Sequence, residues 1–108
     1  MEVLKVSSNS NPNKVAGAIA GELSKNDCVE LQAIGAGAVN QSVKAVAIAR
    51  RFLEEKRKDI NMVPCFEDVI IDGETRTAIS MKVCTTDREG VEELEEEEQP
   101  EDESGFAE

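Results

Sequence analysis

Two glycines, two positions apart, stand between an apparent strand and an apparent helix in "AIGAGAVNQSVKAVAIAR", residues 33–50. Loops of this kind hold phosphate groups, because backbone amides at a helix N-terminus point toward an anion. A dinucleotide site needs G-x-G-x-x-G, but Gly35 and Gly37 are followed by Asn40 where the third glycine belongs. No Gly-Lys-Ser/Thr follows, so the P-loop pattern also fails. The interpretation that we favour for this stretch is a strand-to-helix turn, and the second is an edge of backbone amides that faces an anion. We expect no nucleotide cofactor.

The side chains offer little support for catalysis. The sequence has no histidine, so the commonest general base and the commonest metal ligand are missing. Its serines therefore have no histidine to activate them. Cys28, Cys65 and Cys84 are widely spaced without a C-x-x-C, and we expect three reduced, buried thiols rather than a metal site or a disulfide. We expect a protein that is not an enzyme and has no metal or cofactor.

The net charge of −11 is concentrated at one end of the 108-residue chain. Residues 1–86 carry eleven basic and eleven acidic side chains, whereas residues 87–108 carry one arginine and twelve acids. Like charges repel, and this acidic segment has little apolar surface to bury, so we expect it to be a disordered tail. Residues 1–86 are expected to form one domain with a single core. The start of the chain has no apolar run typical of a signal peptide, and we expect a soluble, cytoplasmic protein.

The hydrophobic periodicity of residues 1–86 predicts the element order β-α-β-α-β-β. Asn11 is expected to cap the first helix, with Pro12 at its first position. Asp72-Gly73 is typical of a two-residue hairpin turn. The expected architecture is an α/β two-layer sandwich, with a four-stranded mixed sheet and two helices on one face. The predicted elements span residues 2–6, 11–23, 28–34, about 39–58, 60–72 and 75–85.

Three residues inside these elements carry further expectations. Gly17 and Gly21 lie four apart in the first helix, where each costs about 1 kcal/mol relative to alanine. We therefore expect another backbone to come close to them. Pro64 cannot donate to a strand ladder, so the third strand should be interrupted there or lie at a sheet edge.

The second helix has two kinds of surface when its residues are placed at 100° steps. Its broad apolar face holds Val39, Val43, Val46, Ala47, Ala49 and Leu53, and its narrow polar wedge holds Asn40, Gln41, Lys44, Arg51 and Glu55. Ile48 and Phe52 lie beyond the wedge, next to Ala45. Either the first helix or a second subunit should cover them, and we hypothesise that they form an oligomer interface.

Long stretches of the chain resemble the stage V sporulation protein S family. They are "MEVLKVSSNSNPNKVAGAIAGEL", "LQAIGAGAVNQSVKAVAIAR" and "PCFEDVIIDGETRTAISMKV", and together they span the predicted domain. The acidic tail lies outside the family's usual extent. The resemblance implies an Alba-like fold, related to the archaeal chromatin protein Alba, with dimers or higher assemblies and a role in nucleic-acid binding. It also implies a part in the sporulation programme, affecting septation and spore maturation.

By position, the Alba resemblance implies three segments that approach nucleic acid: residues 8–14, 35–41 and 72–76. The implied phosphate contacts are Lys14, Lys44, Arg51 and Arg76. The implied neutral contacts are Ser8, Asn9, Asn11, Asn40 and Gln41, around the glycines Gly35 and Gly37. The chain departs from the Alba pattern in two places, because its first loop carries one lysine and "GAGA" carries no basic residue.

Two hypotheses of different classes follow. The first is a non-enzymatic regulatory protein that binds nucleic acid, DNA or RNA, as a homodimer or homotetramer without a membrane segment. The second is a protein-interaction or assembly module whose acidic tail recruits a basic partner. The tail itself could keep the protein soluble, or it could cover the basic wedge as a nucleic-acid mimic.

Overall fold

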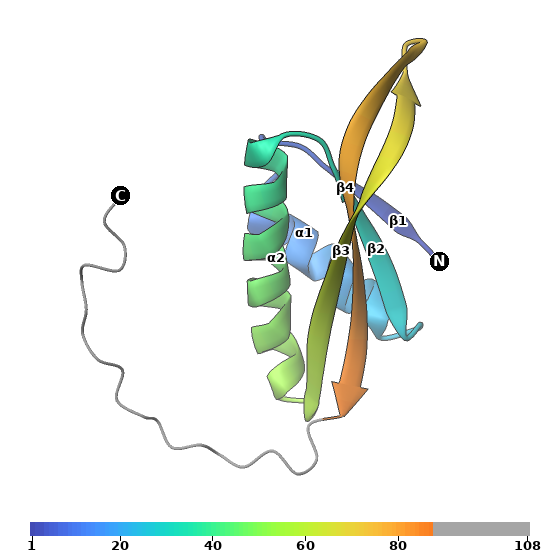
Figure 1. Cartoon of the computed structure of the whole chain (residues 1–108). Coiled ribbons are helices and arrows are strands. Elements are labelled where there is room, and N and C mark those ends of the chain that lie inside the picture. Colours follow the sequence, from blue (N-terminus) through green and yellow to red (C-terminus); the bar gives the residue numbers. More distant parts are fainter. Residues whose placement is uncertain (88–108) are drawn as a thin grey trace, which may run out of the picture.

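The computed structural model describes residues 1–87 and has the predicted element order. A four-stranded sheet carries two helices on one face, and the last two strands extend past this body as a long hairpin (Figure 1). The two-layer α/β architecture is therefore confirmed. The predicted tail, apart from Asp87, lies outside the described residues. The elements are β1 (Val3–Val6), α1 (Pro12–Leu23), β2 (Cys28–Ala33), α2 (Ala36–Glu54), β3 (Lys58–Ile71) and β4 (Glu74–Asp87).

The strand order is β1-β2-β4-β3. β1 and β2 are parallel, as a helical crossover between neighbours requires. β4 pairs antiparallel with β2 on one side and with β3 on the other, so β2 and β3 are not neighbours. β3 is thus the edge strand that Pro64 predicts, and it continues through the proline without interruption. Asp72 and Gly73 turn the hairpin with φ of 52° and 80°, as the dipeptide predicts.

The core lies between the sheet and the two helices. On β2 and β4, alternate residues face the helices and are fully buried, among them Leu31, Met81 and Val83, and Ile19 of α1 packs onto them. Ser42 is the polar member of this layer, and its hydroxyl donates to the carbonyl oxygen of Ala38 at 2.9 Å. That bond satisfies the hydroxyl, so the serine acts as a small core residue.

The second helix differs from its prediction at both ends. It begins at Ala36 rather than Val39, because Gly35, at φ 95°, already turns the chain out of β2. It ends at Glu54 rather than Lys58, because Arg57 adopts a φ of 60° that no α-helix continues through.

The buried face of α2 is also rotated relative to the prediction. Val43 is 45% exposed and Ala47 is exposed, although both were placed on the apolar face. The residues that are buried instead are Ala38, Ser42, Ala45, Ala49 and Leu53. Most of them are small, so the helix backbone can lie close to the layer beneath it.

The expectation for the two glycines of α1 is wrong within this chain. A Cβ added at Gly17 or Gly21 would meet nothing within 4 Å, and both residues are exposed. The close approach occurs instead at Gly37, where an added Cβ would lie 2.9 Å from Cβ of Ser8.

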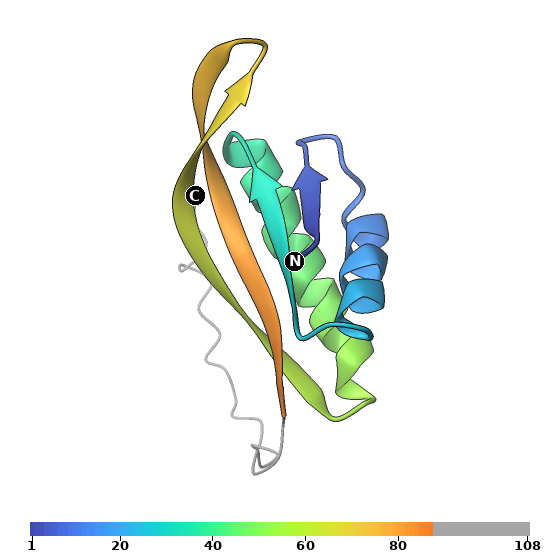
Figure 2. The same cartoon turned by 90° about the vertical axis from the view of Figure 1, so that its right-hand side faces the viewer.

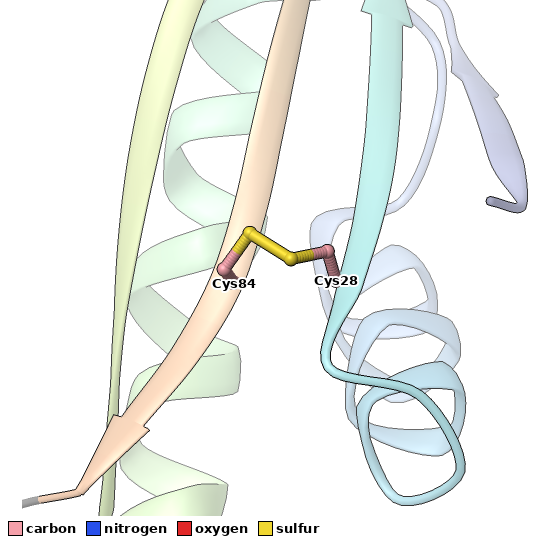
Figure 3. Close-up of a disulfide and its surroundings, with 2 residues drawn as sticks. All are labelled: Cys28 and Cys84. Atoms are coloured by element: carbon pink, nitrogen blue, oxygen red, sulfur yellow. A yellow bond between two sulfur atoms is a disulfide. The ribbon is translucent and has the colours of Figure 1, made fainter.

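The expectation of three reduced, buried cysteines is also wrong. Cys28 and Cys84 form a disulfide between β2 and β4 (Figure 3), and Cys65 is exposed on β3. Cys28 and Cys84 are directly opposite in the antiparallel register, with Cα atoms 4.1 Å apart. The neighbouring pair contains the hydrogen bond from Thr85 N to Asp27 O, so the cysteines occupy the closely spaced, non-hydrogen-bonded position. Their separation of 56 positions concealed this pairing in the sequence.

Candidate nucleic-acid interface

The loop before α1 is held by its own side chains. Ser7 Oγ accepts from the amide of Asn9 at 3.1 Å, and Ser10 Oγ accepts from the amide of Ser7 at 2.9 Å. Asn11 caps α1 as predicted, since its Oδ1 accepts from the amides of Asn13 and Lys14. The oxygen of Asn11 is therefore occupied by the helix, and its amide nitrogen is the group left to face a ligand. Ser8, Asn9 and Lys14 are exposed around this ordered turn.

The glycine loop before α2 leaves the helix N-terminus open. Gly35 is the N-cap residue and provides no side-chain hydrogen bond, and the first turn contains no acidic side chain. The first amides of a helix have no partner within it and carry partial positive charge. The structure confirms the first prediction for this loop, since Gly35 turns the chain from β2 into α2, whereas the anion-facing edge stays a prediction.

A side-chain contact joins the two loops. Gln41 Nε2 donates to the carbonyl oxygen of Ser10 at 2.9 Å, and Gly37 lets the backbone of α2 approach Ser8. The sequence places Gln41 in the solvent-facing wedge, whereas the structure half buries it against the first loop. The loop before α1 therefore lies against the N-terminal part of α2 (Figures 1 and 2).

The remaining wedge residues form an exposed polar row on α2. Asn40, Lys44 and Arg51 all lie on the outer surface of the helix, as predicted. Lys44 and Arg51 are separated by about 10 Å along the helix axis, given a rise of about 1.5 Å per residue. The neighbouring Arg50 is directed elsewhere: its Nε lies 2.6 Å from Oδ1 of Asp59 in β3. That hydrogen bond raises the pKa of Arg50 and compensates its charge locally.

The neutral total of residues 1–86 hides an uneven distribution of charge, which the sequence interpretation missed. No acidic residue occurs between residues 31 and 53, and none occurs between residues 3 and 21. Lys14, Lys44 and Arg51 thus extend from segments that contain no carboxylate. Lys14 and Lys44 lie toward the N-terminal ends of their helices, whereas Arg51 lies in the last turn of α2, where Glu54 and Glu55 follow it.

Arg76 has different surroundings from the other candidate cations. It lies opposite Val69 in the hairpin arm, which projects beyond the body at the same end as the loops (Figure 1). The acidic residues of the arm are Glu67, Asp68, Asp72 and Glu74. Glu67 is tied to the body by Gln32, whose Nε2 donates to its Oε1 at 3.3 Å. The hairpin therefore carries more negative than positive charge around Arg76.

The two residues of the hypothesised oligomer interface have different environments. Ile48 is half buried and packs against the core, whereas Phe52 is 47% exposed. Two apolar side chains on β3 have a greater exposed fraction than Phe52: Phe66 is 78% and Ile70 is 74% exposed. The sequence interpretation did not single out these two side chains as a candidate surface.

A comparison with protein families matches residues 2–86 to stage V sporulation protein S (SpoVS). The chain belongs to the SpoVS family. The match covers all six elements of this SpoVS-family chain except Asp87, the last residue of β4, and it confirms the sequence resemblance. It also supports a sporulation-related protein. No helix in residues 1–87 is long and apolar enough to cross a membrane.

Among solved structures, the SpoVS-family chain is similar to Alba from Thermoplasma volcanium. The two share 12% sequence identity with a TM-score of 0.51, over 79% of this chain and 99% of the archaeal one. At this level of identity the likeness establishes an Alba-like fold for the domain.

Proposed function

We propose that this protein is a non-enzymatic regulator that binds nucleic acid through the two loops at the N-terminal end of its helix layer and the exposed row along α2. The observation that carries the proposal is the junction of two acid-free loops, held together by Gln41 and Ser10, beside the exposed row of Asn40, Lys44 and Arg51. Lysine and arginine neutralise phosphates, and open helix amides and asparagines add neutral hydrogen bonds to the same backbone.

The arrangement favours recognition of the phosphate backbone over readout of bases. The cations are few, and the described loops contain short side chains that are already bonded to their own backbone. Such groups position a duplex or a strand without reading its sequence. We therefore propose binding to DNA or RNA that is dominated by charge, and a cytoplasmic protein acting in sporulation as the family does.

We also propose that the active form is a homodimer or homotetramer. A single copy offers Lys14, Lys44 and Arg51 as the cations of this surface, and two copies double that number on one ligand. Affinity for phosphates increases with each neutralised charge, so assembly compensates for a neutral domain. Phe52, exposed on the flank of α2, is the proposed contact between copies.

The decisive experiment is fluorescence anisotropy of labelled duplex DNA, single-stranded DNA and RNA with the full chain over a range of salt concentrations. We expect the logarithm of the association constant to fall linearly with the logarithm of the salt concentration. No binding to any of the three at about 0.05 M salt would overturn the proposal. That result would favour the second candidate, an assembly module recruiting a basic partner, which the exposed Phe66 and Ile70 and the acidic segment support.

A further inference from the structure

A cavity of about 330 Å³ lies at the opposite end of the molecule from the two loops. It forms where α1 and α2 end and where β3 begins and β4 ends, at the lower end of the views (Figures 1 and 2). Its residues come from three separate parts of the chain. They are Leu23, Ser24, Lys25, Asn26, Asp27, Leu53, Lys56, Lys58 and Thr85.

The cavity combines an apolar floor with a cationic rim. Leu23 and Leu53 are 8% and 5% exposed and belong to the edge of the core. The rim holds three lysines, Lys25, Lys56 and Lys58, against a single carboxylate, Asp27. A site of this composition fits an anionic ligand that also has an apolar group.

The lysine charges are only partly compensated. Nζ of Lys25 lies 3.9 Å from Oε2 of Glu22, and Nζ of Lys58 lies 3.5 Å from Oδ1 of Asp87. Both are ion pairs on the surface. Within residues 1–87, no carboxylate lies within ion-pair distance of Lys56. Lysines at helix C-termini also offset the negative end of the helix dipole, but that effect leaves most of a full charge exposed.

The chain itself supplies a ligand of the right chemistry at this end. β4 passes the cavity at Thr85 and ends two residues later at Asp87, whose carboxylate already contacts Lys58. The residues that follow read "REGVEELEEEE", in which Leu94 is flanked by glutamates on both sides. An apolar side chain between acidic ones matches an apolar floor within a lysine rim.

The reach of this segment is sufficient. Leu94 is seven residues beyond Asp87, which allows a span of about 23 Å when extended. Tethering over so short a length gives an effective concentration in the millimolar range, so weak contacts are enough to hold the segment.

We propose that the acidic segment docks in cis on this lysine-rimmed cavity, with Leu94 toward Leu23 and Leu53 and the neighbouring glutamates toward Lys25 and Lys56. The inference is independent of the proposed function. It places the segment at the end of the molecule away from Lys14 and Lys44, and so leaves those two lysines and the two loops uncovered, whereas Arg51 lies two residues from Leu53 of the cavity.

The test uses the full chain with a nitroxide attached at Gln99→Cys in a Cys65→Ser background. Paramagnetic broadening of backbone amide signals then reports which surface the segment visits. We expect the strongest broadening at Lys25, Asn26 and Lys56 at low salt, and its loss near 1 M salt, where the Debye length is about 3 Å.

Two matched variants remove the same charge from different surfaces. Lys25→Gln/Lys56→Gln should lower the ratio of docked to free segment about fivefold, the effect of two surface ion pairs. Lys14→Gln/Lys44→Gln should leave that ratio unchanged. The proposal would be overturned by broadening centred on Asn40 and Lys44 or by broadening spread uniformly over the whole surface. Equal effects of the two double variants would also overturn it.

A second measurement needs no label and tests the glutamates directly. Replacing Glu92, Glu93, Glu95 and Glu96 by glutamine in the full chain should shift the amide signals of Lys25, Asn26 and Lys56 at low salt. The Leu94→Ser variant should produce a smaller shift at the same signals. Unchanged signals in the glutamine variant would contradict docking, as would changes confined to the two loops at the other end.

Discussion

Gln41 Nε2 and the carbonyl oxygen of Ser10 form a hydrogen bond of 2.9 Å across 31 residues of sequence. This bond holds the N-terminal part of α2 against the loop that precedes α1. The candidate interface therefore behaves as one surface assembled from two loops, with a packed layer beneath it and a polyanion as its proposed ligand.

Gln41→Ala should lower the free energy of unfolding by about 1 kcal/mol, because a half-buried hydrogen bond is removed and the carbonyl of Ser10 keeps no side-chain partner. Urea denaturation of the full chain measures the change. Asn40→Ala is the control, since this neighbour is exposed and should alter stability by less than about 0.5 kcal/mol. Equal effects of the two substitutions would show that the hydrogen bond does not stabilise the domain.

Gly37→Ala should destabilise the protein by about 1–3 kcal/mol, because the new Cβ would lie 2.9 Å from Cβ of Ser8. Gly17→Ala should have the opposite effect and stabilise by up to about 1 kcal/mol, since its surroundings are open and alanine favours a helix. Thermal and urea unfolding compare the two.

The clash at Gly37 has a specific rescue. Ser8→Gly removes the atom that an alanine would meet, so Ser8→Gly/Gly37→Ala should be more stable than the sum of the single changes predicts. Additive single effects would mean that the destabilisation in Gly37→Ala comes from another source.

Cys84→Ser should lower the free energy of unfolding by about 2–4 kcal/mol, because the disulfide closes a long loop between β2 and β4. Reductant should destabilise the native chain by the same amount and leave Cys84→Ser unaffected. Cys65→Ser is the matched control, as this thiol is exposed and unbonded. Alkylation in cell extracts before and after reduction measures how much of the bond exists in cells. A native chain that reductant does not destabilise would contradict the prediction.

Lys44→Gln/Arg51→Gln should reduce the slope of log affinity against log salt by nearly 2, about 0.9 for each phosphate of duplex DNA that is no longer neutralised. Lys82→Gln on the sheet should leave the slope unchanged. Arg76→Gln should have a smaller effect than Lys44→Gln, because Asp72 and Glu74 stand beside it in the hairpin. A slope that falls equally for Lys82→Gln would mean that binding is spread over the whole surface.

Phe52→Glu should convert the proposed dimer to a monomer, because the charge would be buried between copies at the flank of α2. Light scattering after gel filtration gives the mass in solution. Phe66→Glu makes the same change on β3, where the side chain is 78% exposed. If Phe66→Glu lowers the mass and Phe52→Glu does not, the interface lies on the edge strand and the hypothesis for Ile48 and Phe52 is wrong.

Features that depend on neighbouring residues could be predicted from the amino-acid sequence alone. The cap at Asn11, the hairpin turn at Asp72-Gly73 and the alternation of Met81 and Val83 in β4 all follow from local backbone preference and periodicity. Gly35 belongs here too, since its positive φ follows from the need to turn a strand directly into a helix. These local rules were enough to predict the element order and the two-layer architecture.

Features that depend on contacts between segments distant in sequence are decided only by the tertiary structure. β4 lies between β2 and β3, and that single pairing choice puts Cys28 opposite Cys84. The hydrogen bond of Gln41 with Ser10 and the lysine-rimmed cavity likewise join parts of the chain that are far apart in sequence. Periodicity reports which face of an element is apolar, but it does not report which neighbour covers it, and for that reason Val43 is exposed where the pattern predicted burial.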